Sequence, residues 1–283
     1  MASAQKGRTE IFRGMNDIKL VGDIYGDPSG DPVLFLHGGG QTRHAWGGAA
    51  QVLAENGWYV VTLDQRGHGE SEWPDQKDYS VDSFTGDVRK VAATFNKLPA
   101  LVGASMGGGS ALVAQGESEK QICSALVLVD VTPRVEMKGV QRIMDFMTQK
   151  PEGFESLEEV ADAIAAYTPN RKRTKNLEGL KKNLRQLPNG RYRWHWDPDM
   201  IGVRFAERME NPDRMVDAAR HIKVPTLLVR GQQSDVVSME GANEFLELVP
   251  HAKFIDVEGA GHMVAGDQND VFTNAVLDFL RAV

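Results

Sequence analysis

The chain has 283 residues, 41% hydrophobic and 25% charged, and a formal net charge of −7 at pH 7, a composition typical of a globular enzyme and unfavourable for binding nucleic acid or an anionic membrane. Cys123 is the single cysteine, which excludes an intrachain disulfide and a thiol pair for metal or redox chemistry. Met1–Arg13 lacks the apolar run of a secretory signal and no stretch approaches the ~18 apolar residues of a membrane span, so we expect a cytoplasmic protein without a membrane partner.

Strands and helices are predicted in alternation along most of the chain. Strands are expected at 10–13, 19–25, 33–36, 58–63, 100–102, 125–129, 224–229 and 253–257. Helices are expected at 46–56, 80–96, 110–115, 238–248 and 271–280. The runs at 33–36 and 125–129 are apolar without interruption, as in strands that are buried on both faces. The pattern predicts an α/β protein with a parallel sheet between two layers of helices.

The segment from Pro133 to Ala219 interrupts this alternation. It shows no strong strand, and amphipathic helices are expected at 153–167 and 177–187, followed by a turn at Asn189-Gly190. We therefore expect an insertion at 133–219, after the sixth strand, in a core formed by 1–132 and 220–283.

The expected strand at 100–102 leads directly into Gly103-Ala-Ser-Met-Gly107, and a helix follows. Strand, tight turn and helix are the context of a nucleophile elbow, which exposes a serine at its apex. Glycines two positions to either side of Ser105 leave space for the strained turn. The pattern also fits a glycine-rich turn with an incidental serine, so its weight depends on partner residues elsewhere.

A serine nucleophile needs a base and a group that orients the base, both at the strand ends where loops of a parallel sheet gather. His262 follows the expected strand at 253–257, and Asp235 follows the strand at 224–229. The order Ser105, Asp235, His262 is the order of a catalytic triad on this architecture. Asp130 ends another strand and is a rival for the acid, but we favour Asp235 because of its G-x-x-S-D-x-V surroundings.

Acyl transfer also requires amide donors for the oxyanion. The backbone N–H of Met106 is one expected donor, and Gly39, after the strand at 33–36, is the other, with Gly40 as the alternative. Loss of one donor would cost roughly 3 to 4 kcal/mol of transition-state stabilisation. Gly40 and Trp194 are expected to line the substrate pocket, with packing of the insertion against the core as the alternative for Trp194.

Histidines in the same loops raise the possibility of a metal site. His37, His44 and His68 lie near Asp64 in the sequence, but no metal-binding helix spacing is present. We interpret Asp64–Ser71 as a structural turn in which Arg66 and His68 tie loops together. We expect His195 to face solvent or a backbone group, and we predict no metal ligand.

Together these motifs resemble the α/β-hydrolase fold superfamily. The matching stretches are Leu36-His-Gly-Gly-Gly40, Asp64-Gln-Arg-Gly-His-Gly-Glu-Ser71, Val102-Gly-Ala-Ser-Met-Gly-Gly108, Arg230-Gly-Gln-Gln-Ser-Asp-Val236 and Gly259-Ala-Gly-His262. The resemblance implies a mainly parallel eight-stranded sheet, a helical cap at 133–219 and no cofactor. The chain is similar to cap-bearing bacterial serine esterases, lactonases and haloperoxidase-like hydrolases.

The expected activity is hydrolysis of a small, mainly apolar carboxylic ester through an acyl-enzyme on Ser105. The same triad would serve a lactonase or a carbon–carbon bond hydrolase, although the latter usually have asparagine where this chain has Ala104. Epoxide hydrolases and haloalkane dehalogenases of this fold use an aspartate at the position of Ser105. A hydrolase-fold binding protein with little turnover is the non-enzymatic alternative. The expected partner is a small-molecule ester or lactone, and a homodimer is left open.

Overall fold

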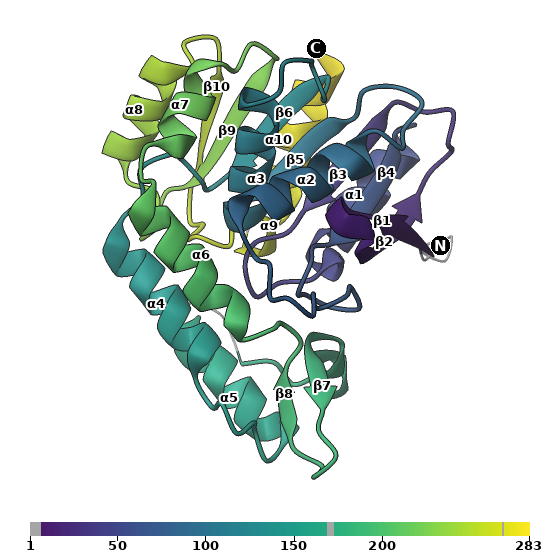
Figure 1. Ribbon diagram of the computed structural model, residues 1–283. Coiled ribbons are helices and arrows are strands. Elements are labelled where there is room, and N and C mark those ends of the chain that lie inside the picture. The colour runs from purple at the N-terminus through teal and green to yellow at the C-terminus, as the bar shows by residue number, and fades with distance from the viewer. Residues whose placement is uncertain (1–6, 169–172, 268) are drawn as a thin grey trace.

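A computed structural model describes residues 7–168, 173–267 and 269–283 of the chain. Its centre is an eight-stranded sheet with the order β1-β2-β4-β3-β5-β6-β9-β10 (Figure 1). The strands are β1 (Arg8–Arg13), β2 (Lys19–Tyr25), β3 (Pro32–Leu36), β4 (Tyr59–Asp64), β5 (Ala100–Ala104), β6 (Ala125–Val129), β9 (Thr226–Gly231) and β10 (Lys253–Val257). β2 pairs antiparallel with β1 and β4, and all other neighbours are parallel. The predicted mainly parallel eight-stranded sheet is confirmed.

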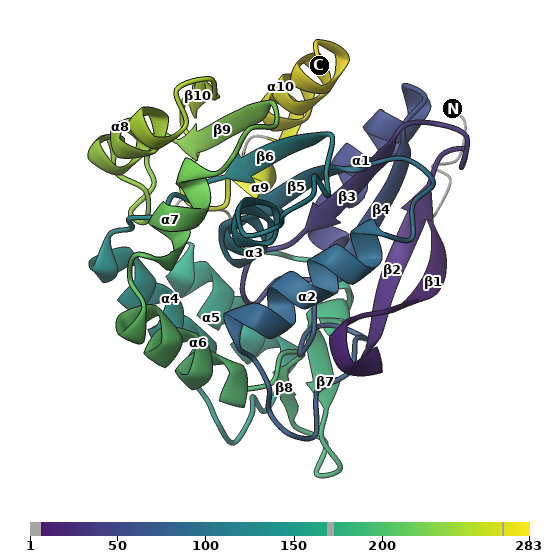
Figure 2. The same cartoon turned by 45° about the horizontal axis from the view of Figure 1, so that its top comes forward.

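Alternate residues of the central strands point to opposite faces of the sheet. In β3, Leu34 and Leu36 belong to one buried cluster, and Val33 and Phe35 belong to the other. The helices outside the insertion are α1 (Gly47–Glu55), α2 (Val81–Ala92), α3 (Ser105–Gly116), α7 (Arg214–Arg220), α8 (Met239–Leu248), α9 (Val264–Asp267) and α10 (Asn269–Arg281). Residues of α2, α3, α7 and α8 pack in the first cluster, and residues of α1 and α10 pack in the second (Figure 2). Helices thus cover both faces, as predicted.

Most of the chain between β6 and β9, from α4 to α6, forms a group of elements beside the sheet (Figure 1). Its elements are α4 (Met137–Thr148), α5 (Leu157–Tyr167), the 3-10 helix η3 (Glu178–Asn183), β7 (Leu184–Gln186), β8 (Tyr192–Trp194) and α6 (Asp199–Glu210). A third buried cluster joins this segment to the core, since it contains Trp194 and Trp196 together with Tyr79 and Phe84. We call residues 133–213 the cap segment.

Two expectations within this region differ from the structure. The helix predicted at 177–187 is wrong, because the chain forms η3 and then β7, which pairs antiparallel with β8. α7 falls inside the predicted insertion, yet its Ala219 lies in the core cluster, and a Cβ added to Gly116 of α3 would lie 2.2 Å from the carbonyl oxygen of Ala218. α7 therefore packs on the core. Residues 1–6 and 169–172 of the predicted domains lie outside the described residues.

Two further findings bear on the predicted environment. Over the residues that the structure describes, no helix is long and apolar enough to cross a bilayer. The thiol of Cys123 is fully buried in the core cluster, and this burial raises its pKa to about 12. Cys123 therefore packs within the core as a small, buried residue.

Candidate active site

Ser105 occupies the turn between β5 and α3, and it is the first residue of that helix. Its φ of +45° lies in the left-handed region, which non-glycine residues rarely adopt. The flanking glycines allow close packing. A Cβ added to Gly103 would lie 2.6 Å from Gly108, and one added to Gly107 would lie 2.5 Å from the carbonyl oxygen of Leu36. The predicted strained strand–serine–helix turn is thus present.

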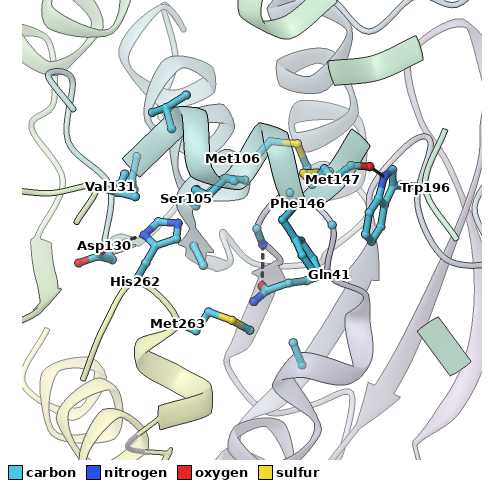
Figure 3. A pocket seen from close by; sticks show the side chains of 18 of the residues that line it. Gln41, Ser105, Met106, Asp130, Val131, Phe146, Met147, Trp196, His262 and Met263 are labelled. Carbon is cyan, nitrogen blue, oxygen red and sulfur yellow. Dashed lines mark hydrogen bonds and ion pairs between the residues drawn. The ribbon is translucent and has the colours of Figure 1, made fainter. Parts of the chain in front are cut away.

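The imidazole of His262 lies between Asp130 and Ser105 (Figure 3). Its Nδ1 is 2.7 Å from Oδ2 of Asp130, whose side chain is fully buried. Nε2 is therefore the ring nitrogen left for the Ser105 side. Ser105, His262 and Asp130 all line one cavity.

Asp130 follows β6 directly and has a φ of +49°. Besides His262, its carboxylate accepts hydrogen bonds from the amide of Gly231 at 2.9 Å and from the hydroxyl of Ser234 at 2.5 Å. These three donors satisfy a carboxylate that has no access to water. The buried acid is held firmly by the ends of both β6 and β9.

The expectation that Asp235 orients His262 is wrong. The Asp235 carboxylate instead pairs with Arg142 of α4, with Nε and Oδ2 2.8 Å apart, and both side chains are more than a third exposed. The loop after β9 contributes through the preceding residue, because Ser234 donates to Asp130 and accepts from the amides of Val236 and Val237. The position of Asp130 at the end of a strand is the sequence signal for this acid, whereas the G-x-x-S-D-x-V pattern favours Asp235.

The amides expected to bind an oxyanion lie at the same end of the sheet. Met106 is in the first turn of α3, where an N–H has no intrahelical acceptor. Gly39 lines the cavity, and its N–H has no acceptor among the described residues. The amide of Gly40 donates to Nε2 of His68 at 3.2 Å, which makes it unavailable to a substrate. Of the two glycines considered, the geometry favours Gly39.

The cavity has a volume of about 650 Å³ and extends from Ser105 between the core and the cap segment. Gly40 and Trp194 line it, in agreement with their predicted positions. Trp194 also stacks on Trp196, with ring centroids 4.9 Å apart, so it packs the cap and borders the cavity. The other apolar lining side chains come mainly from α3, α4 and α6, and include Met106, Val140, Ile143, Met144, Phe146, Met147, Met200 and Ile201. The site therefore suits a mainly apolar ligand.

The Asp64–Ser71 stretch ties the surrounding loops together, as expected. Asp64 is fully buried and binds the side chain and the amide of Arg43. Arg66 makes a two-pronged contact with Asp87, with both N–O distances at 2.7 Å. These side chains are therefore occupied by hydrogen bonds and ion pairs within the chain.

Comparison with known proteins identifies the family. The model of the alpha/beta hydrolase fold matches residues 31–268. The chain belongs to this family.

Among its relatives is the esterase Rv0045c of Mycobacterium tuberculosis, 29% identical over 263 residues that cover 89% of this chain and 82% of that protein. The sn-1-specific diacylglycerol lipase ABHD11 of Mus musculus is 27% identical over 266 residues, which cover 90% and 82%. The crystal structure of E-2-(acetamidomethylene)succinate hydrolase superposes with a TM-score of 0.85 at 22% identity, over 97% of this chain and 99% of that one. At this identity the superposition shows the fold alone.

Proposed function

We propose that the protein is a serine hydrolase that cleaves carboxylic esters of small, mainly apolar substrates, with Ser105, His262 and Asp130 as its triad. The observation that carries the proposal is the bond from Nδ1 of His262 to the buried carboxylate of Asp130, with Ser105 at the strained elbow on the other side of the ring. Relatives named esterase and diacylglycerol lipase support ester hydrolysis. As expected from the sequence, we place the enzyme in the cytoplasm, with esters or lactones as substrates.

The chemistry follows from these positions. Nε2 of His262 takes the hydroxyl proton as Oγ of Ser105 bonds to the ester carbonyl carbon, and the carbonyl oxygen becomes an oxyanion. The C–O bond of the ester then breaks, and His262 returns the proton to the leaving alcohol. Water attacks the acyl-enzyme by the same route and releases the acid. Asp130 holds the imidazole in the tautomer with hydrogen on Nδ1 and stabilises the imidazolium.

Two backbone amides would bind the oxyanion. The N–H of Met106 and the N–H of Gly39 are the proposed donors. Among the described residues, neither has to break an existing hydrogen bond when the substrate binds. Preorganised donors of this kind are worth about 10²- to 10³-fold each in rate, because they need no reorganisation in the transition state.

The test is turnover of p-nitrophenyl butyrate by the wild type and by Ser105→Ala. We expect a burst and steady turnover in the wild type, and a loss of at least about 10⁴-fold in the variant. Mass spectrometry after a fluorophosphonate label should place the adduct on Ser105. Equal turnover by the variant would refute the mechanism. Ligand binding without turnover or labelling would instead support a binding protein.

A further inference from the structure

Three buried histidines lie behind the loop that carries Gly39, and the reaction as described does not use them. His37 and His68 are fully buried and His195 is 1% exposed. The ring centroids of His37 and His68 are 4.8 Å apart, and those of His68 and His195 are 5.8 Å apart. His37 follows β3 and His68 follows β4, whereas His195 follows β8 in the cap segment. The cluster therefore joins the core to the cap.

Hydrogen bonds assign one tautomer to His68 and one to His195. His68 accepts the N–H of Gly40 on Nε2, so its Nδ1 carries the hydrogen and donates to the carbonyl of Arg66 at 3.0 Å. His195 accepts the N–H of Gly69 on Nδ1 at 2.7 Å, so its Nε2 donates to the carbonyl of Gly40 at 3.3 Å. Gly40 is thus held by one histidine through its N–H and by the other through its C=O.

Gly38 is held in the same way on the other side. Its carbonyl accepts Nδ1–H of His37 at 2.8 Å, and its N–H donates to the side chain of Gln41 at 3.0 Å. The ring of His37 is in turn fixed by the amide of Gln65, which donates to Nε2 at 3.0 Å. With both polar backbone groups of Gly38 and Gly40 occupied, the amide of Gly39 is the one left to meet the cavity within the described structure.

We propose that His195 is a positioning residue, through which the cap segment orients the Gly39 amide of the oxyanion hole. The hydrogen bond from His195 to Gly40 stops the loop from rotating, so the donor is already aimed when the oxyanion forms. Trp196 and Met147 support the same glycine, because a Cβ added to Gly40 would lie 3.4 Å from each. The inference rests on the proposed ester hydrolysis.

Two substitutions separate the two hydrogen bonds of His195. In His195→Gln the amide nitrogen can reach the place of Nε2 and keep the bond to Gly40. In His195→Asn the amide oxygen can take the place of Nδ1 and keep the bond to Gly69, but nothing reaches Gly40. We expect kcat to fall roughly 10- to 100-fold in His195→Asn with KM nearly unchanged, since a misplaced donor loses part of what a missing donor loses. His195→Gln should restore most of kcat.

Inhibitor binding distinguishes positioning from a general structural role. A trifluoromethyl ketone forms a tetrahedral adduct with an oxyanion, whereas the matching methyl ketone binds without one. If His195 positions the donor, His195→Asn should weaken binding of the trifluoromethyl ketone by the same factor as the loss in kcat. Binding of the methyl ketone should be unchanged. Equal weakening of both ketones, or unchanged kcat, would overturn the proposal. If wild-type turnover did not depend on Ser105, the proposed function would fail first, and this inference with it.

A measurement on the wild type covers the case in which both variants fail to fold. Nitrogen-15 NMR of histidine-labelled protein reports which ring nitrogen carries the hydrogen. We expect hydrogen on Nε2 of His195 and on Nδ1 of His68 at pH 7.5. Hydrogen on Nδ1 of His195 would leave it unable to donate to Gly40 and would overturn the proposal.

Discussion

At the residue scale, the site depends on which of two strand-end carboxylates meets His262. Asp130 and Asp235 both follow parallel strands that are neighbours in the sheet. Burial separates them, because Asp130 is fully enclosed among donors and Asp235 is exposed beside Arg142. A buried carboxylate with three donors can orient an imidazole, whereas an exposed ion pair contributes only about 0–1 kcal/mol to stability.

We therefore predict opposite outcomes for the two amide substitutions. Asp130→Asn should lower kcat by about 10⁴-fold, because the amide favours the wrong tautomer of His262. Asp235→Asn, the matched control, should stay within about threefold of the wild type. Steady-state kinetics with p-nitrophenyl butyrate, together with thermal unfolding of both variants, measures this. Loss of activity in Asp235→Asn alone would reverse the assignment.

Sequence patterns located Ser105 and His262 at the edge of the sheet where the structure has them, because each follows an expected strand and a glycine-containing turn. They could not choose between the acids. That choice depends on the left-handed backbone of Asp130 and on the hydroxyl of Ser234, which turns toward Asp130. Both are properties of the folded loop, and no residue spacing in the sequence indicates them.

At the element scale, α4 forms one wall of the cavity and places its methionines differently. Met144 and Met147 line the cavity, whereas Met137, at the first turn, is 45% exposed. The position of a methionine along α4 therefore decides whether it limits the size of the substrate.

Met147→Ala should shift the preference toward longer acyl chains. Each additional buried methylene is worth about 0.8 kcal/mol, which is about fourfold in kcat/KM. The ratio of kcat/KM for p-nitrophenyl hexanoate to that for the acetate should rise several-fold, while Met137→Ala leaves it unchanged. A shift in both variants, or in neither, would contradict the placement of α4.

The hairpin β7–β8 shows why the cap was harder to predict than the core. The strands at 33–36 and 125–129 are uninterrupted apolar runs, which the structure has within one residue. Residues 184–186 have no such run, and they become a strand by pairing with 192–194. The turn at Asn189-Gly190, where Gly190 has a φ of +82°, is typical of a hairpin and is the sequence signal for this pairing.

At the scale of the whole molecule, the buried histidines make folding sensitive to acid. Burial lowers the pKa of His37 to about 4, and burial followed by the neighbouring His37 lowers the pKa of His68 to about 3, from an ordinary value of 6.5. Burial, then His68 and His37, lower the pKa of His195 as well. Below pH 6.5 the unfolded chain takes up these protons and the folded chain does not.

Stability should therefore fall as the pH is lowered from about 6.5 to 4, by about 1.4 kcal/mol per pH unit for each of His37 and His68. At pH 5.0 the loss is about 2 kcal/mol for each of these two histidines. Urea unfolding at pH 7.5 and 5.0 measures the loss. His37→Gln removes one of these groups, so its loss should be smaller by about 2 kcal/mol. An equal loss in the free energy of unfolding between pH 7.5 and 5.0 in the wild type and the variant would show that His37 does not contribute.

The cap segment leaves the core at the end of β6 and returns before β9, two strands that pair directly with each other. In topological terms it is a long connection between neighbours, so a chimera with a foreign cap would preserve every strand pairing of the core. Such a graft would nevertheless remove His195, and with it one of the two histidines that hold Gly40. A chimera with an exchanged cap must therefore also contain a hydrogen-bond donor to the carbonyl of Gly40.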